Sequence, residues 1–153
     1  ALLLDLGNDS LDISLLKSDA GTRTILKKGT SGATSLTGSF SGFSGELELR
    51  SSVSTPGVLT SNNLFNVGGA SFDNASKLIL DGAAVFFGNA SGLANVLVDI
   101  EIGDNGAAFH ANGGATNGIV LSGILTGNGM LSGLDDSGIH VTFPAMSADL
   151  PEI

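Results

Sequence analysis

Hydrophobic and polar residues alternate along several short stretches of the chain. Leu47 and Leu49 stand between Glu46, Glu48 and Arg50, and the same pattern covers residues 96–102 and 139–143. A period of two residues places one face of a strand in a core and the other in water. A helix would require a stretch of about a dozen residues without glycine in which apolar residues recur every 3.6 positions, and no stretch of the chain meets both conditions. The pattern therefore predicts an all-β protein.

Clusters of Gly, Asn, Asp and Ser separate these strands, and one of the clusters recurs. Residues 81–89 read DGAAVFFGN and residues 105–113 read NGAAFHANG. Gly82 and Gly106 are 24 residues apart, and Gly129 follows 23 residues later. Gly, Asn and Asp permit tight corners because they tolerate positive φ. A strand and corner that return every 20–24 residues are typical of a solenoid, in which stacked coils share one interior.

The repeat predicts a single β-solenoid domain over residues 1–153, of about six or seven coils, which can also be a segment or subunit of a longer rod or fibre. Small inward or corner positions are expected at Ala83, Ala84, Ala107 and Ala108. Phe86 and Phe109 are expected to stack as an internal aromatic ladder. The alternative is an antiparallel β-sandwich or jelly roll, which also has alternating strands and glycine-rich turns. The repeat favours the solenoid.

Composition limits the classes of partner. The 153 residues are 42% hydrophobic, which suits one domain with a core, and they include no cysteine for a disulfide or a thiolate metal site. Residues 1–77 hold seven acids and all six Lys and Arg, a net charge of −1, whereas residues 78–153 hold eight acids and no Lys or Arg, a net charge of −8. Nucleic-acid binding needs clustered cations and is not expected. No apolar run approaches the roughly 20 residues of a membrane span.

Three carboxylates and two histidines are the candidates for chemistry. Asp99 and Glu101 share one face of a strand, with Asp104 close by, and paired carboxylates can hydrolyse glycosides. Outward acids also keep a strand soluble and discourage edge pairing, and the chain has no Trp or Tyr to stack on a sugar. His110 and His140 lack a nearby pair of carboxylates and do not predict a zinc site. No catalytic residue is assigned, and no enzymatic activity is expected.

Three polar segments could supply oxygen ligands to calcium. Residues 68–76 match part of the nonapeptide of calcium β-rolls, but once only, whereas such sites need tandem copies. Residues 103–106 and 134–138 are rich in Asp, Asn and Ser. We expect at most incidental Ca²⁺ here and assign no metal or cofactor site.

Residues 27–49, KKGTSGATSLTGSFSGFSGELEL, resemble the autotransporter-associated β-strand repeat. The matching positions are Lys27-Lys28-Gly29, Gly32, Leu36-Thr37-Gly38, Phe43-Ser44-Gly45 and the alternating Leu47 and Leu49. Repeats of this family build right-handed parallel β-helices in secreted bacterial passenger domains. The resemblance implies that fold, a place on the bacterial cell surface, an adhesive or scaffolding role, and no catalytic residues.

The expected function is that of an extracellular structural or adhesive protein. The open ends of a solenoid carry unpaired strands that must be capped or paired, and the charge is uneven along the chain. We therefore expect end-to-end packing of copies into a fibre or surface layer, with a surface glycan as a further partner. The alternatives are a carbohydrate-active β-helix enzyme or carbohydrate-binding module, and a capsid-like or pilin-like β-sandwich subunit.

Overall fold

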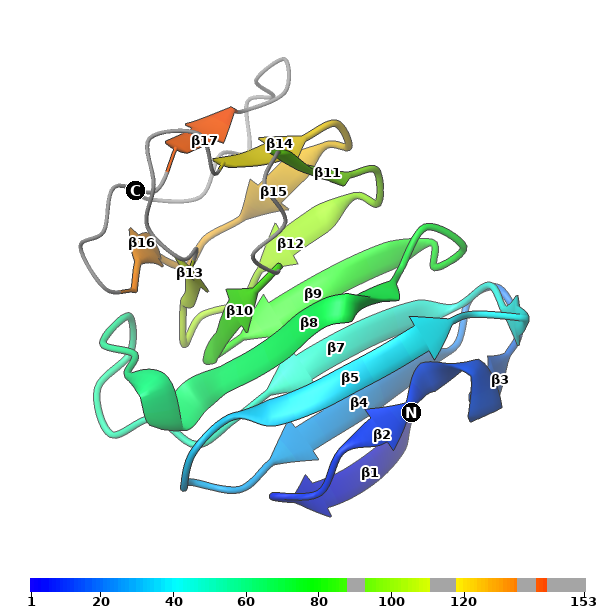
Figure 1. Ribbon diagram of the computed structural model, residues 1–153, viewed down its shortest axis with the longest axis horizontal. Coiled ribbons are helices and arrows are strands. Elements are labelled where there is room, and N and C mark those ends of the chain that lie inside the picture. The colour runs from blue at the N-terminus through cyan, green and yellow to red at the C-terminus, as the bar shows by residue number, and fades with distance from the viewer. Residues whose placement is uncertain (88–92, 111–117, 135–139, 143–153) are drawn as a thin grey trace.

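Parallel β-sheets that stack as a solenoid of about five turns make up the protein (Figure 1). The computed structural model describes residues 1–87, 93–110, 118–134 and 140–142. Helix in these residues is limited to two short 3₁₀ segments, η1 (Ile13–Leu15) and η2 (Ser61–Asn63).

Two six-stranded sheets form the main walls. Sheet A has the order β1 (Leu2–Gly7), β4 (Arg23–Lys28), β7 (Glu46–Arg50), β9 (Lys77–Asp81), β12 (Ile100–Ile102) and β15 (Leu125–Gly127). Sheet B has the order β16 (Leu131–Gly133), β13 (Ala107–His110), β10 (Ala83–Phe86), β8 (Leu64–Ser71), β5 (Thr34–Ser39) and β2 (Leu11–Asp12).

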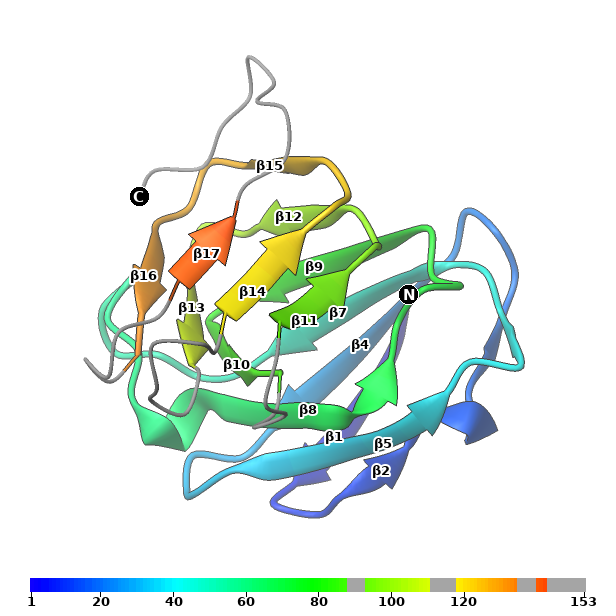
Figure 2. The ribbon, with the colours of Figure 1, turned by 45° about the horizontal axis from the view of Figure 1, so that its top comes forward.

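Two smaller sheets complete the coils. One consists of β3 (Lys17–Ser18) and β6 (Gly42–Phe43), and it belongs to the first coils. The other consists of β11 (Leu93–Val96), β14 (Gly118–Leu121) and β17 (His140–Thr142), which lie side by side in the later coils (Figure 2).

Every pairing between strands of the described residues is parallel, which confirms the solenoid and excludes the antiparallel sandwich. Successive partners along one line of sheet A are Leu2, Thr24, Leu47, Leu78, Ile100 and Leu125. Four of the coils are thus 22 to 25 residues long, and the third takes 31 residues. The chain forms about five turns, fewer than the six or seven expected, in part because this coil carries an additional segment between β7 and β8.

Alternation along each strand builds the interior. In sheet A the inward residues of neighbouring coils lie directly above one another, as in the column Leu26, Leu49, Leu80 and Ile102, all of which are buried. Most of the intervening outward positions hold charged residues, with Ile25, Ile79 and Thr126 as exceptions. The segment that resembles the autotransporter-associated repeat forms one coil, because Lys27 at its start pairs with Arg50 just after its end.

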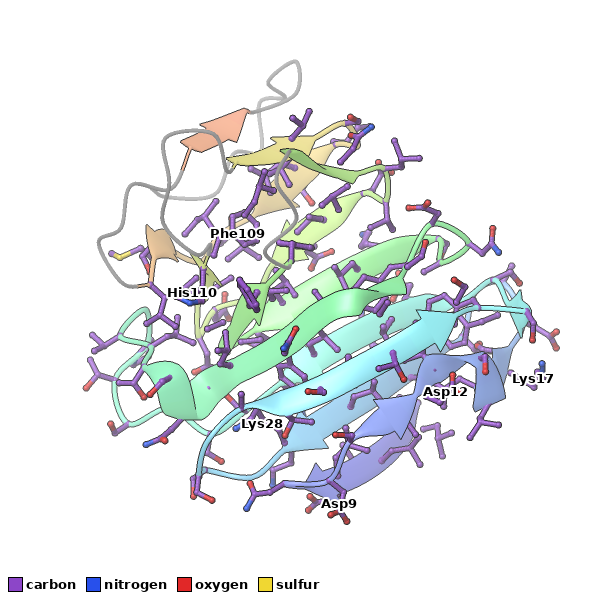
Figure 3. All side chains as sticks on the ribbon, in the orientation of Figure 1. Asp9, Asp12, Lys17, Lys28, Phe109 and His110 are labelled. Atoms are coloured by element: carbon purple, nitrogen blue, oxygen red, sulfur yellow. The ribbon has the colours of Figure 1, made fainter. Side chains whose placement is uncertain are left out.

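The predicted ladder of Phe86 on Phe109 is wrong by one position. Ala83 and Ala84 do pair with Ala107 and Ala108, and all four are buried as expected, but Val85 then lies opposite Phe109. The extra valine shifts the first aromatic of the earlier copy to the outer face, where the Phe86 ring lies 5.1 Å from the ring of His110. Phe109 packs inward, edge-on to Phe87 at 5.6 Å. Figure 3 labels Phe109 and His110, the last two residues of β13.

The repeated corner is confirmed for its first two copies. Gly82 and Gly106 have φ of 71° and 83°, and the amide of Gly82 donates to the carbonyl of Gly106 over 2.7 Å. The third copy is displaced by one residue. Ala107 pairs with Leu131, which places Met130, and not Gly129, beside Gly106. In that coil Gly127 has the positive φ.

Lys28 is a buried cation at the end of β4 (Figure 3). The residue is 1% exposed, and its ammonium donates to the carbonyls of Gly29, at 2.7 Å, and Asn62. Burial lowers the pKa of Lys28 from the ordinary value of 10.5 because a desolvated ammonium is disfavoured.

We expect this lowered pKa to make the stability of the protein rise with pH. At pH values between the lowered pKa of Lys28 and 10.5, the unfolded chain binds more protons than the folded chain. Below this pH range the folded protein bears the full free-energy cost of burying the charged ammonium, and above it that cost disappears. Urea unfolding of wild type and of Lys28→Met, measured from neutral pH to pH 10.5, should show wild type gaining stability relative to the variant. A difference that is constant or falls with pH would contradict this assignment.

Candidate functional site

The outer face of sheet A carries a network of ion pairs that links neighbouring coils. The Arg23 guanidinium lies 2.9 Å from Glu46 Oε2 through Nε and 3.5 Å from Glu48 Oε1 through Nη1. Arg50 Nη2 lies 2.6 Å from Glu48 Oε2. One coil further, Lys77 Nζ lies 2.8 Å from Glu101 Oε2. The sheet register produces these contacts, because Arg23 pairs with Glu46 and both Glu46 and Glu101 lie on strands adjacent to β9.

The ion pairs also stabilise the charged forms of their cations. The hydrogen bond that Arg23 donates to Glu46 is the main cause that raises the pKa of Arg23, and the hydrogen bond that Lys77 donates to Glu101 does the same for the pKa of Lys77. Both cations remain half-exposed, so each contact contributes about 0–1 kcal/mol to stability. Glu48 differs from them, since its side chain is only 4% exposed beneath the two arginines.

An open hollow of about 360 Å³ lies where this face meets the corners after β9, β12 and β15. Two guanidiniums, four carboxylates and two carboxamides contribute to its wall, and the only large apolar side chains are two isoleucines. The lining residues are Arg23, Glu48, Arg50, Ile79, Asp81, Glu101, Ile102, Gly103, Asp104, Asn105, Gly127 and Asn128. Asp81, Asn105 and Asn128, the residues before the three glycines of the repeat, thus gather at one edge of the rod.

Hydrogen bonds from Asn105 hold one acceptor of this hollow, Asp81, in place. Asp81 Oδ1 accepts from the amide of Asn105 at 3.0 Å and from its side-chain Nδ2 at 3.1 Å. Gly103 lies directly against the Asp81 carboxylate, because a Cβ at position 103 would come within 2.6 Å of Oδ1. The corner therefore fixes the direction of Asp81 without a neighbouring cation in contact with Oδ1.

The three carboxylates singled out from the sequence separate into two groups. Glu101 and Asp104 both line the hollow. Asp99 precedes β12, and its Oδ1 accepts from the amide of Ile124 at 2.8 Å, which ties it to the corner of the next coil. Asp99 is therefore a structural cap, and the pair of Asp99 and Glu101 does not form within the hollow.

The histidines are not brought together. His110 is in β13 of sheet B, where Nδ1 lies 2.8 Å from the carbonyl oxygen of Leu134 and the ring packs on Phe86. His140 begins β17, which belongs to a different sheet. The two histidines therefore lie on strands of different sheets.

The segments considered for calcium do not converge either. Gly68 to Ser71 belong to β8, Asp73 follows the strand and is exposed, and residues 103–106 form a corner of the hollow. Of residues 134–138, only Leu134 lies within the described part of the chain. In the ranges that the structure describes, no three His, Asp or Glu residues are grouped so that they could hold a metal ion.

Sequence reasoning missed Glu48, Arg50 and Arg23 as members of one site. The alternation of residues 46–50 placed Glu48 and Arg50 on the outer face, and this was the one sequence feature that pointed to their position in the site. Their convergence with Asp81 and Asp104 depends on coil lengths, since the 31-residue third coil sets which residue of β9 lies beside β7.

Within the described ranges, no helix has the length and apolar character needed to cross a bilayer. Comparisons of the chain with models of protein families, with curated proteins and with solved structures found no match.

Proposed function

We propose that the protein is a structural or adhesive module of the bacterial cell surface, similar to an autotransporter passenger domain, whose copies associate through the β1 end of the solenoid. The coil formed by residues 27–49 supports the family likeness, and the continuous stack of parallel strands supports a load-bearing role. The proposed surface location rests on the resemblance of that coil to the autotransporter-associated repeat.

The observation that carries the proposal is the apolar side chains of β1, which is the edge strand of sheet A in the described residues. Leu2 and Leu4 lie opposite Thr24 and Leu26, which are buried residues of β4, and Leu4 and Leu6 pack against the core. No strand of the described residues covers their other side, and Leu2 is 53% exposed. An edge strand with free backbone groups and apolar side chains is a template for pairing with another chain.

The opposite end of the rod differs from the β1 end. Leu125 and Leu131, the inward residues of the last strands of sheets A and B, are already buried. A head-to-tail fibre needs both ends open, whereas a two-copy contact needs only one. The structure of the described residues therefore favours a pair of rods joined at β1, which doubles the length of the charged lateral faces available for adhesion.

Sedimentation velocity over a series of protein concentrations tests this proposal. Wild type should shift from monomer to dimer, and Leu2→Lys should raise the dissociation constant at least tenfold, because a lysine ammonium would be desolvated in the contact. The matched control is Leu97→Lys, since Leu97 is 52% exposed but lies between β11 and β12. Circular dichroism confirms that each variant retains its strands.

A wild-type chain that stays monomeric at every concentration would refute self-association. Equal weakening by Leu2→Lys and Leu97→Lys would place the contact away from β1. Growth of wild type beyond a dimer would support a fibre in place of the pair.

A further inference from the structure

The loop between β7 and β8 is closed at its base by one buried side chain. The carboxamide of Asn63, a residue that is 6% exposed, bonds to both ends of the loop. Its Nδ2 donates to the carbonyl of Ser52 over 3.0 Å, and its Oδ1 accepts from the amide of Thr60 over 2.9 Å. Residues 52–60 are therefore an Ω-loop, a compact segment whose two ends lie close together.

The tip of this loop is a tight turn. Pro56 occupies the second position of the turn, and Gly57, with a φ of 80°, occupies the third. The amide of Val58 donates to the carbonyl of Thr55 over 3.0 Å and closes the turn. Proline followed by a residue of positive φ is the pattern of a type II turn. The sequence of the loop thus determines the shape of its tip.

The tip contacts a coil that is not adjacent to its own. Gly57 belongs to the third coil, and its amide donates to the carbonyl of Asn105, in the fifth coil, over 3.0 Å. Gly106 leaves room for this contact because it has no side chain, and a Cβ there would lie 2.9 Å from Gly57 Cα. Met130, which follows β15, touches the same tip, since its Sδ lies 3.4 Å from the position of a Gly57 Cβ.

The loop passes the fourth coil between its base and its tip. Val53 Cγ1 lies 3.4 Å from the position that a Cβ of Gly82 would take, at the corner of the fourth coil. The loop is at the left of Figure 1, between β7 and β8. It accounts for the greater length of the third coil, which takes 31 residues where the other coils take 22 to 25.

A contact between coils that are not neighbours changes how a solenoid opens. Each coil of such a fold ordinarily touches only the next one, so coils can separate one at a time from an end. Here the fifth coil cannot separate from the third until the tip of the loop has left Gly106 and Met130.

We propose that residues 52–60 are a strap that makes the third coil and the later described coils open as one unit. The strap opposes unravelling of the rod from its β15 end. It acts within one chain and does not depend on self-association at β1, so either proposal can fail without the other.

Native-state hydrogen exchange of the whole chain, at urea concentrations below the unfolding transition, tests the strap. The probes are amides that donate to backbone carbonyls, Ser76 in the third coil and Ile100 and Ala107 in the fifth. In wild type all three should exchange through one opening, with the same free energy and the same dependence on urea. Protection that falls from Ser76 to Ala107 in wild type would contradict the strap.

Deletion of residues 53–59 removes the strap and brings the third coil to the length of the others. The deletion joins Ser52 to Thr60, which Asn63 already holds close together. Protection of the two fifth-coil amides should then fall about tenfold relative to the third-coil amide. The comparison is made within one protein, because a general loss of stability lowers all three amides alike. An unchanged ratio would refute the proposal.

A disulfide between the tip and its contact tests the same coupling without a deletion. The position of a Gly57 Cβ lies 3.4 Å from Met130 Cβ, close to the separation of about 3.5–4.5 Å in disulfides. Gly57→Cys with Met130→Cys should therefore close under mild oxidation. Closure should raise the protection of the fifth-coil amides, relative to the third-coil amide, about tenfold over the reduced form of the same variant.

The matched control pair is Gly32→Cys with Met130→Cys. Gly32 also has a positive φ, 66°, but it belongs to the second coil, and a Cβ there would meet nothing within 4 Å. This pair should stay reduced. Failure of the Gly57 pair to close, or equal closure of the control pair, would show that the tip does not rest on Met130. Closure without a change in relative protection would refute the coupling, and this test holds even if the shortened chain fails to fold.

Discussion

Replacing Phe109 by alanine should lower the free energy of unfolding by about 3–5 kcal/mol, whereas Phe86→Ala should cost about 1 kcal/mol. Phe109 is 1% exposed and belongs to the interior, where truncation leaves a cavity that the stacked coils cannot close. Phe86 lies on the outer face and loses little more than its contact with the His110 ring. Urea unfolding followed by circular dichroism measures both effects.

The pair of phenylalanines is a matched comparison, because both are strand residues near the same repeated corner. The internal ladder expected from the sequence would give similar, large losses for both variants. A loss in Phe86→Ala as large as that in Phe109→Ala would therefore contradict the register in which Val85 lies opposite Phe109.

The second large effect is expected at the repeated corner. Gly106→Ala should lower the free energy of unfolding by about 3 kcal/mol, of which about 1–2 kcal/mol comes from the left-handed backbone. The remainder is steric, because a Cβ would lie 2.9 Å from Gly57 Cα and 3.0 Å from the carbonyl oxygen of Met130. Both contacts are to backbone atoms, which cannot rotate away as a side chain can.

Gly32→Ala separates the two causes. Gly32 has a φ of 66°, but a Cβ there would meet nothing within 4 Å. This variant should therefore show the conformational cost alone, about 1–2 kcal/mol. Equal losses in Gly106→Ala and Gly32→Ala, measured by the same urea unfolding, would show that the segment around Gly57 does not pack against the corner.

The fold was predictable because alternation and a recurring corner are local signals. The inward leucines of residues 46–50 and the corners at Gly82 and Gly106 could be read directly from the sequence. The register between strands could not be read from the sequence, because one inserted residue moves every later side chain of that strand to the opposite face of the sheet. Val85 is such an insertion, and it moved Phe86 outward while leaving the two alanines before it in place.

The candidate site was less predictable because it combines residues of different coils. Strand alternation predicts that Asp99 and Glu101 share one face, and Asp104 joins them only because it is close in sequence. The structure assigns Asp99 to the amide of Ile124, a contact that depends on where β12 begins. Glu48 and Arg50 join the hollow only because the 31-residue coil brings β7 beside β9, and no local pattern reports a coil length.

Consecutive coils stack in parallel, with Phe86 directly beside His110. The chain has no cysteine, so introduced pairs report this register directly. Adjacent strands are about 4.8 Å apart, within the Cα separation of about 4.4–6.8 Å that a disulfide spans. We predict that Phe86→Cys with His110→Cys forms an intramolecular disulfide under mild oxidation, seen by intact mass as the loss of the thiol hydrogens. Phe86→Cys with Phe109→Cys should remain reduced, because those side chains lie on opposite faces of sheet B. Closure of the second pair, or of neither, would contradict the parallel register of Phe86 and His110.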